Sequence, residues 1–489
     1  MKSKKLQDAI GMIDEDLVER ADKTQKNKAT KRAKLLKLVK WTAPIAAMLA
    51  VVFIVGIFIG NGAPFNPLVL NAHAIYEAQY PEMSAYPGDE RLPGFENRHD
   101  AWYEDQRIKR GHYGAGKNLE AFIQKISAEI LCESGGENRV YSPLNVYMAL
   151  AMLAEITDGE SRRQILNLLG SEDMEALRTQ AYSVWNANYN NDGSVTSILA
   201  SSLWLNQNIA FNDKTMKTLA ENYYASSYRG EMGSSDFNKA LQTWLNKQTG
   251  GLLEDYISEL EMTPDTVLAL ATTIFFQAKW SDEFSENQTK KEIFHSVNGD
   301  KETDFMHSSE LYGSYYWGEK FSATSKTLEN SGSMYFILPD EGVSIDELLA
   351  DEEALSFLSA NRKWENQKSL IVNLSVPKFD VSSKLELKEN LQNLGVTDCF
   401  IPDVSDYTPL LDKSAMDLEK DLYLSKVEHG ARVAIDEEGV TAAAYTAMIL
   451  CGAGMPPQDE IDFVLDRPFI FVITGEDGLP LFIGTVNQI

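Results

Sequence analysis

The spacing of hydrophobic residues predicts a body of mixed helices and strands in the C-terminal three quarters of the chain. Apolar side chains recur every three or four residues from 118 to 133, which predicts a helix. A second predicted helix, within 140–153, opens at Ser142-Pro143, a pattern typical of a helix start. The predicted buried strands and hairpin strands are 195–204, 267–276, 369–376, 468–473 and 481–486. Helices come first and alternate irregularly with later strands, so the pattern favours an α+β fold over a doubly wound one.

Residues 41–60, WTAPIAAMLAVVFIVGIFIG, form an uncharged apolar run of 20 residues. At helical rise such a run spans roughly 30 Å, one hydrocarbon thickness. Lys34, Lys37 and Lys40 precede it and no charge follows until Glu77. Because positive charges stay on the cytoplasmic side, we predict a single-pass cell-membrane protein whose C-terminal body is extracellular. A cleaved signal peptide is the alternative, although its apolar run usually stops at about 7–15 residues.

The two segments that flank this predicted transmembrane helix differ in composition. Residues 1–40 hold 12 basic and 6 acidic side chains and are predicted to be a cytoplasmic basic tail. Residues 61–116 hold five of the sixteen prolines and show poor periodicity, which predicts an extracellular stalk or linker. Its aromatic residues are candidates for packing on the domain. A basic leader before one anchor favours a bacterial plasma membrane.

Composition excludes several classes of function. The net charge of −27 disfavours nucleic-acid binding, which needs a basic face. The three cysteines, Cys132, Cys399 and Cys451, are too few for a disulfide scaffold and permit at most one internal bridge. Six histidines make no metal-ligand spacing, and no nucleophile elbow, P-loop or dinucleotide fingerprint occurs. We therefore expect no catalytic residue, no metal and no cofactor.

The most informative segment is 436–458, DEEGVTAAAYTAMILCGAGMPPQ. An alanine-rich helix is one interpretation, because alanine has the highest helix propensity. The alternative is a segment able to become a strand. In steps of two, the face that begins at Val440, Ala442 and Ala444 is small and uncharged, so nothing on it would prevent burial beneath a sheet.

Here the chain resembles the serpin family, over residues 117–489. The motifs that carry the resemblance, in order, are YSPLNVYMALAMLAEITDGESRRQILNLLG, LQTWLNKQTGG, TTIFFQAKWSDEF, VPKFDV, LYLSKVEHGARVAIDEEGVTAAAYTA and RPFIFVITGEDGLPLFIGTVNQ. The resemblance implies one large domain with three β-sheets and about nine helices. It also implies that a protease cleaves an exposed reactive loop and becomes an acyl-enzyme. The hinge side of the loop then enters the main sheet and drags the protease along.

The resemblance assigns roles residue by residue. It places the scissile bond at Ala453–Gly454, with a few residues downstream as the alternative, and pairs Lys378 with the hinge residue Glu437. Trp280 lies under the point of first insertion, the breach. The reactive-loop hinge is Glu437, Glu438, Gly439, Val440, Thr441, Ala442, Ala443 and Ala444. The sheet-opening cluster is Ser142, Asn145, Thr272 and His429, with Thr272 where the family usually has asparagine.

Two functions remain open at this point. The first is a membrane-tethered protease inhibitor, and the second is a non-inhibitory serpin that acts as a binding or structural protein. The small residues of the hinge favour the first. Because Ala453 offers only a methyl group, the expected partner is an elastase- or subtilisin-like serine protease, with a papain-like cysteine protease as the lesser option.

Overall fold

The computed structural model describes residue 70 and residues 73–489, except 92, 117, 252–256, 258–259, 265, 360–363, 416–421 and 441–458. Residues 65–489 form one compact unit. Within the described residues no helix combines the length and apolar character needed to cross a membrane. The predicted transmembrane helix at 41–60 and the tail at 1–40 lie outside these residues.

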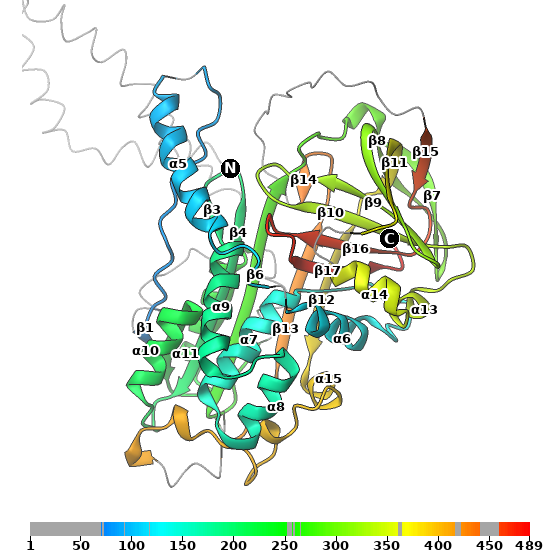
Figure 1. Cartoon of the computed structure of the whole chain (residues 1–489). Helices are drawn as coiled ribbons and strands as arrows, with labels where there is room; N and C mark the ends of the chain where they lie inside the picture. The colour runs from blue at the N-terminus through cyan, green and yellow to red at the C-terminus, as the bar shows by residue number, and fades with distance from the viewer. Residues whose placement is uncertain are drawn as a thin grey trace, which may run out of the picture. The chain divides into compact units, whose positions relative to one another are not determined.

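The described residues contain ten α-helices (Figure 1). They are α5 (Phe95–Arg110), α6 (Glu120–Leu131), α7 (Pro143–Ile156), α8 (Gly159–Leu169), α9 (Met174–Asn188), α10 (Asp213–Tyr223), α11 (Ser235–Gln248), α13 (Ile345–Leu349), α14 (Glu352–Ser359) and α15 (Lys388–Asn393). The predicted cap is confirmed, since the Ser142 side chain accepts from the Asn145 backbone N–H and proline opens α7.

The strands form three hydrogen-bonded sheets. The strands are β1 (Ala74–Tyr76), β2 (Arg139–Tyr141), β3 (Asn190–Asn191), β4 (Thr196–Asn206), β5 (Ala225–Gly230), β6 (Leu268–Lys279), β7 (Lys290–Ser296), β8 (Gly299–Trp317), β9 (Phe321–Thr327), β10 (Ser333–Pro339), β11 (Gln367–Pro377), β12 (Asp380–Glu386), β13 (Glu428–Ala434), β14 (Gly439–Val440), β15 (Glu460–Val464), β16 (Phe469–Thr474) and β17 (Pro480–Val486). One sheet has the order β1-β5-β4-β6-β14, and β3 pairs with β4. The second has the order β15-β11-β8-β9-β10-β16-β17-β2, and β7 pairs with β8. β12 and β13 form the third, so the predicted α+β class with three sheets is confirmed.

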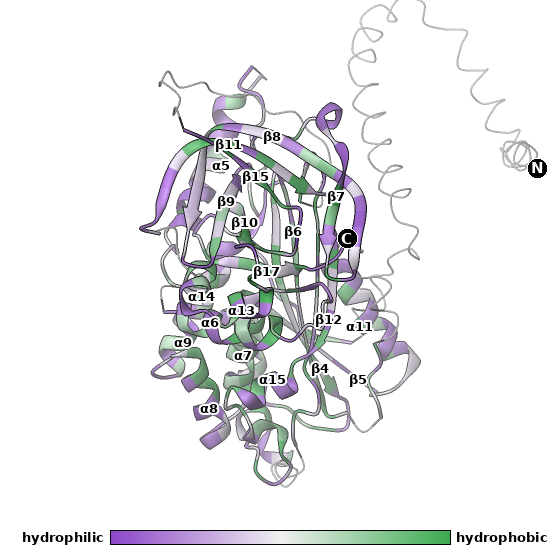
Figure 2. Ribbon diagram, turned by 90° about the vertical axis from the view of Figure 1, so that its right-hand side faces the viewer, coloured by the Kyte–Doolittle hydropathy of each residue, from purple (hydrophilic) through white to green (hydrophobic). Residues whose placement is uncertain are grey.

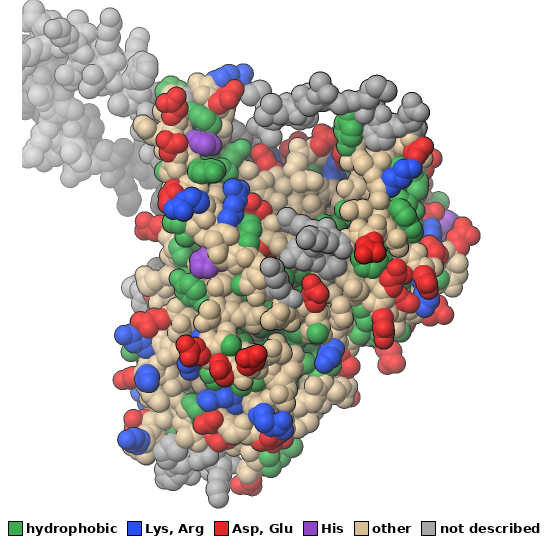
Figure 3. All heavy atoms as spheres, in the orientation of Figure 1, with side chains coloured by type: hydrophobic (Ala, Val, Ile, Leu, Met, Phe, Trp, Pro, Cys, Tyr) green, Lys and Arg blue, Asp and Glu red, His purple; other side chains and the backbone are tan. Residues whose placement is uncertain are grey.

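Hydrophobic burial explains this arrangement. All residues of α7 are buried, and in Figure 2 this helix is largely hydrophobic, whereas β7 is mostly hydrophilic. A smaller cluster fills the space between α11 and the main sheet, where the Trp204 and Phe237 rings lie 5.3 Å apart. In Figure 3 acidic side chains gather over α13 and α14, in keeping with the acidic composition.

Residues 73–116 differ from the expected irregular stalk. β1 pairs antiparallel with β5, with Ala74 opposite Tyr228, and α5 has 16 residues. The predicted aromatic packing is present, since the Tyr80 ring lies 5.4 Å from that of Trp185. The buried face of α5 is polar, which explains why hydrophobic periodicity missed the helix. It consists of Gln106 and Lys109, with the half-buried Trp102 one turn before them.

Buried and half-buried acidic residues hold α5 in place. The Trp102 indole N–H donates to Asp192 Oδ2 at 2.8 Å, and Asp192 is 2 % exposed. Lys109 lies near Glu476, Asp192 and Asp477, whose charges raise its pKa, but burial lowers the pKa more. The Arg110 guanidinium lies 3.0 Å from Glu476 Oε1. β1 and α5 are therefore part of the packed body.

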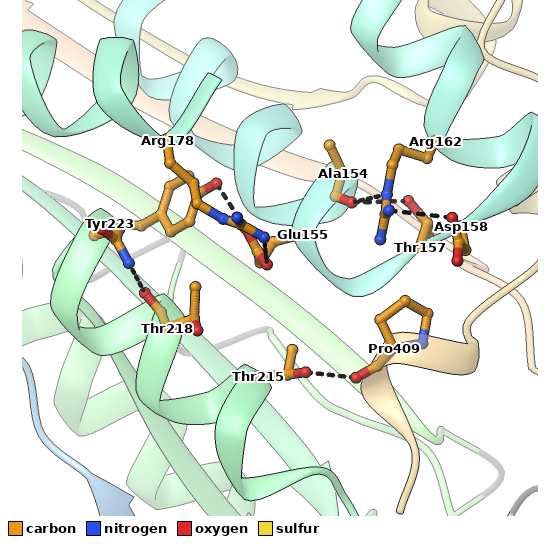
Figure 4. Close-up of polar contacts among 11 residues, drawn as sticks. Ala154, Glu155, Thr157, Asp158, Arg162, Arg178, Thr215, Thr218, Tyr223 and Pro409 are labelled. Carbon is orange, nitrogen blue, oxygen red and sulfur yellow. Dashed lines mark hydrogen bonds and ion pairs between the residues drawn. The ribbon is translucent and has the colours of Figure 1, made fainter. Parts of the chain in front are cut away.

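A buried carboxylate joins three helices and provides a stability prediction (Figure 4). Glu155 of α7 is 6 % exposed and accepts two 2.7 Å hydrogen bonds from Arg178 of α9. It also accepts one at 3.0 Å from Tyr223 of α10. Glu155→Ala leaves both donors without this acceptor, so we expect a loss of about 3 kcal/mol in the free energy of unfolding, measured by urea denaturation.

The exposed Glu175→Ala in α9 is the matched control and should change stability by less than about 0.5 kcal/mol. In a double-mutant cycle, Arg178→Ala should cost much less in the Glu155→Ala background than alone. Additive effects would contradict the coupling between the two side chains.

Candidate functional site

The candidate site is a gap between two neighbouring sheets. β6 of the sheet β1-β5-β4-β6-β14, called the main sheet, lies on one side, and β13 of the two-stranded sheet lies on the other. On one side β6 pairs with β4 along nearly its whole length, from Leu268 to Gln277. On its other side, within the described residues, β6 pairs only with β14, through Gly439 opposite Lys279 and Val440 opposite Ala278. β13 is the neighbour across the gap, and of the strands that the structure describes it pairs with β12 alone (Figure 1). The backbone edges of β6 and β13 that face the gap are therefore left to accept a further strand.

The hinge begins where β13 ends. The Asp436 carboxylate accepts from the backbone N–H groups of Glu438 and Gly439, at 3.0 and 3.1 Å, and turns the chain back. Val440 then enters the top of the gap and is 1 % exposed. Gly439 must be glycine here, since a Cβ atom would lie 2.4 Å from the Ala278 carbonyl oxygen. The turn was not foreseen, although an aspartate three residues before a glycine is a turn signal.

Trp280 lies against this turn, as the resemblance implies. Its indole N–H donates to the Asp436 carbonyl oxygen at 2.9 Å, and its backbone N–H donates to the Glu438 carbonyl oxygen at 3.0 Å. The ring is 1 % exposed. The tryptophan thus fixes the position of the hinge as well as filling the core beneath it.

The structure brings together Lys378 and Glu437, at 2.6 Å between Nζ and Oε2. Thr289 Oγ1 donates to the other carboxylate oxygen at 2.7 Å. Burial raises the pKa of Glu437, but the hydrogen bonds from Lys378 and Thr289 lower it more, so its pKa lies below the ordinary value. The carboxylate is thus charged at neutral pH and holds the start of the hinge. Sequence reasoning did not identify Thr289, which carries no motif.

The sheet-opening cluster is assembled only in part. His429 Nε2 accepts from the Ser142 backbone N–H at 3.1 Å, and both residues are buried. Asn145 lies one turn along α7, and its side-chain oxygen and nitrogen are buried without a hydrogen-bond partner among the described residues. Thr272 and His429 line the same two cavities from opposite strands. Asn145 therefore brings two unsatisfied polar atoms to the point where the strands part, which is uncommon for a buried side chain.

Burial lowers the pKa of His429 from its ordinary value of 6.5 to about 4. The native state keeps the ring neutral, whereas the unfolded chain binds a proton below the ordinary value. The free energy of unfolding is therefore not reduced by His429 above pH 6.5. It falls as the pH drops toward 4, by about 3 kcal/mol from this group.

The measurement is the free energy of unfolding from pH 7 to pH 4 for wild type and His429→Gln, whose side-chain oxygen can accept the Ser142 hydrogen bond. The variant should lose less stability on acidification than wild type. His112→Gln, at a half-buried surface position, is the control and should follow wild type. Parallel curves for His429→Gln and wild type would show that His429 has no part in the acid response.

The lower part of the gap is a cavity of about 310 Å³, lined by residues 268–273 of β6, 428–430 of β13 and the underside of α11. Hinge residues 441–444 and the predicted scissile bond Ala453–Gly454 lie outside the described residues, as does Cys451. Cys132 and Cys399 are free. Among the described residues no group of His, Cys, Asp or Glu side chains is arranged to hold a metal ion.

Comparison with known proteins identifies the class to which this fold and site belong. The family model described as Serpin (serine protease inhibitor) matches residues 117–489. The chain therefore belongs to the serpin family, whose members are generally serine protease inhibitors and are not enzymes.

Individual relatives agree with this assignment. Serpin-ZX of Arabidopsis thaliana is 28 % identical over 365 residues, which cover 72 % of this chain and 92 % of the relative. An uncharacterized serpin-like protein of Methanosarcina acetivorans is 28 % identical over 370 residues, covering 72 % and 81 % of the two chains. The crystal structure of the thermophilic serpin tengpin in the native state has a TM-score of 0.66 at 26 % identity and covers 85 % of this chain and 98 % of tengpin.

Proposed function

We propose that the protein inhibits serine proteases by cleavage of its reactive loop, covalent trapping of the acyl-enzyme and insertion of the loop between β6 and β13. The observation that carries the proposal is the hinge itself. Gly439 and Val440 already pair with the top of β6, while below them no described strand pairs with this edge of β6. A strand that continues downward from Val440 needs no new entry point.

The chemistry requires no catalytic group from the inhibitor. The protease serine oxygen bonds to the carbonyl carbon of Ala453, the bond to Gly454 breaks, and the amine leaves with a proton. Insertion then adds backbone hydrogen bonds on both edges of the new strand, each contributing about 1 kcal/mol, together with apolar burial. The acyl bond carries the protease along, which removes its active site from the geometry that deacylation needs.

The deciding experiment is incubation of residues 61–489 with elastase, subtilisin, trypsin and papain, followed by denaturing electrophoresis. We expect a covalent complex that survives SDS with an elastase- or subtilisin-like enzyme. Cleavage without a complex would contradict the inhibitory mechanism and favour a binding or structural role for this serpin.

We further propose that residues 41–60 anchor the protein in a plasma membrane, bacterial by our inference, with residues 61–489 outside the cell. The support is the uncharged run of 20 residues and the lysines before it. Protease added to intact cells should release a fragment close to the mass of the serpin domain. Release only from permeabilised cells would reverse the orientation, and a chain that begins near residue 61 without added protease would indicate a cleaved signal.

A further inference from the structure

The cavity in the lower part of the gap has the features of a ligand site. Its volume of about 310 Å³ lies at the lower end of the range for small-molecule sites. The wall formed by α11 and the segment that follows it is mostly apolar, although Thr263 and Thr266 also line it. Its apolar side chains are Leu241, Leu245, Ile257, Leu260 and Met262. The facing wall belongs to the sheet, where Ala269, Ala271 and Gly430 present at most a methyl group. Small side chains on one wall and large apolar ones on the other leave a space suited to an apolar body.

One polar group in this lining is unsatisfied. Thr273 of β6 is 2 % exposed and lines the cavity, and its hydroxyl has no hydrogen-bond partner among the described residues. The nearby Ser202 hydroxyl, in contrast, donates to the Ala271 carbonyl. A buried hydroxyl without a partner is unfavourable and is uncommon in folded proteins. Thr273 therefore points to a ligand atom that can donate or accept one hydrogen bond.

Charges around the cavity decide the class of ligand. Exposed Lys384 and Lys426 lie at the rim together with Glu261 and Glu428, and Lys426 forms an ion pair with Glu428. Among the described lining residues, acidic and basic groups are thus equal in number, and β6, which carries Thr273, contributes no lysine or arginine. A carboxylate beside Thr273 would be desolvated without a cationic partner, which is costly.

We propose that this cavity binds a small uncharged amphipathic molecule, with an apolar chain or ring and one hydroxyl or carbonyl oxygen that hydrogen-bonds to Thr273. Such a ligand occupies the space between the edges of β6 and β13, so it competes with an inserted strand. The regulatory consequence rests on the function proposed above. Binding would stabilise the uninserted form and delay insertion, which turns more inhibitor molecules into cleaved substrate.

The test is calorimetric titration of residues 61–489 with 1-octanol, with sodium octanoate as the charged analogue. We expect saturable binding at one site, weaker for octanoate. Thr273→Val keeps the shape of the side chain and should lower the affinity for octanol about 3- to 10-fold. Ala271→Leu fills the cavity from the same face of β6 and should abolish binding. Thr243→Val, on α11 but outside the lining, should bind as wild type does.

Absence of saturable binding to wild type would overturn the proposal, as would an unchanged affinity in Thr273→Val or Ala271→Leu. Equal affinity for octanol and octanoate would refute the inference that the ligand is uncharged. Protein cleaved in the reactive loop distinguishes this inference from the proposed function. If the loop inserts, cleaved protein should no longer bind octanol. If cleaved protein still binds it, the cavity site stands and the insertion mechanism fails.

Discussion

Val440→Arg should turn the protein from an inhibitor of its target protease into a substrate. Val440 is 1 % exposed and pairs with Ala278 at the top of the gap, so any inserted strand must carry this side chain beneath the sheet. An unpaired buried guanidinium costs about 3–5 kcal/mol. Because Val440 is buried before cleavage as well, the charged side chain should first drive the hinge out of the top of the gap. Its re-entry then carries this cost, which slows insertion by about 100-fold or more, so that hydrolysis of the acyl-enzyme outpaces insertion.

The measurement is the amount of SDS-stable complex relative to cleaved protein, at several molar ratios of protease to serpin. Ala442→Asp, two residues along on the same predicted face, should behave like Val440→Arg. Thr441→Arg, on the opposite face, is the matched control and should retain most of the complex. Cleavage at the same bond in all three variants would show that recognition is intact. Full complex yield in both Val440→Arg and Ala442→Asp would disprove the assignment of this face to burial.

The second large effect concerns specificity. Ala453→Arg should raise the rate of trypsin inhibition at least ~100-fold, because the buried carboxylate of a trypsin-type pocket gains the cationic partner that a methyl group lacks. Inhibition of an elastase-like enzyme should fall, since its shallow pocket excludes the longer side chain. The hinge is untouched, so the variant should form complexes with trypsin at the same stoichiometry as the wild type does with its elastase- or subtilisin-like target.

Mass spectrometry of the released C-terminal peptide locates the bond. We expect a peptide that begins at Gly454 in wild type and in Ala453→Arg treated with trypsin. The control Met455→Arg places the same charge two residues downstream and should not improve trypsin inhibition at the original bond. A wild-type peptide that begins at Met455 or later would move the scissile bond and remove the basis of this prediction.

Sequence patterns predict the fold well where burial is apolar and regular. The cap of α7 and the runs that became β4, β6 and β11 follow from hydrophobic patterning and turn residues. α5 was not predicted from the hydrophobic pattern, because Gln106 and Lys109, rather than leucines, face the body. Its stability comes from contacts with Asp192 and Glu476, which lie far away in the sequence. No local pattern can contain such pairings.

The candidate site shows the same division. The ion pair of Lys378 with Glu437 was expected from the resemblance, and the two side chains lie together. The pairing of Gly439 and Val440 with β6 was not, because it joins segments far apart in the sequence, and the glycine that the close approach requires does not by itself name the partner strand. The unsatisfied amide of Asn145 is likewise invisible in the sequence, since it depends on which groups of distant segments pack beside α7.

β1 has a practical consequence for anyone who prepares the domain. Ala74–Tyr76 covers the outer edge of β5, so a fragment that starts at residue 117 would leave an unprotected strand edge in water. Open strand edges recruit other chains, and such a fragment would be prone to self-association and precipitation. The limits of the family match therefore differ from those of the smallest well-behaved unit, which has to include β1 and α5.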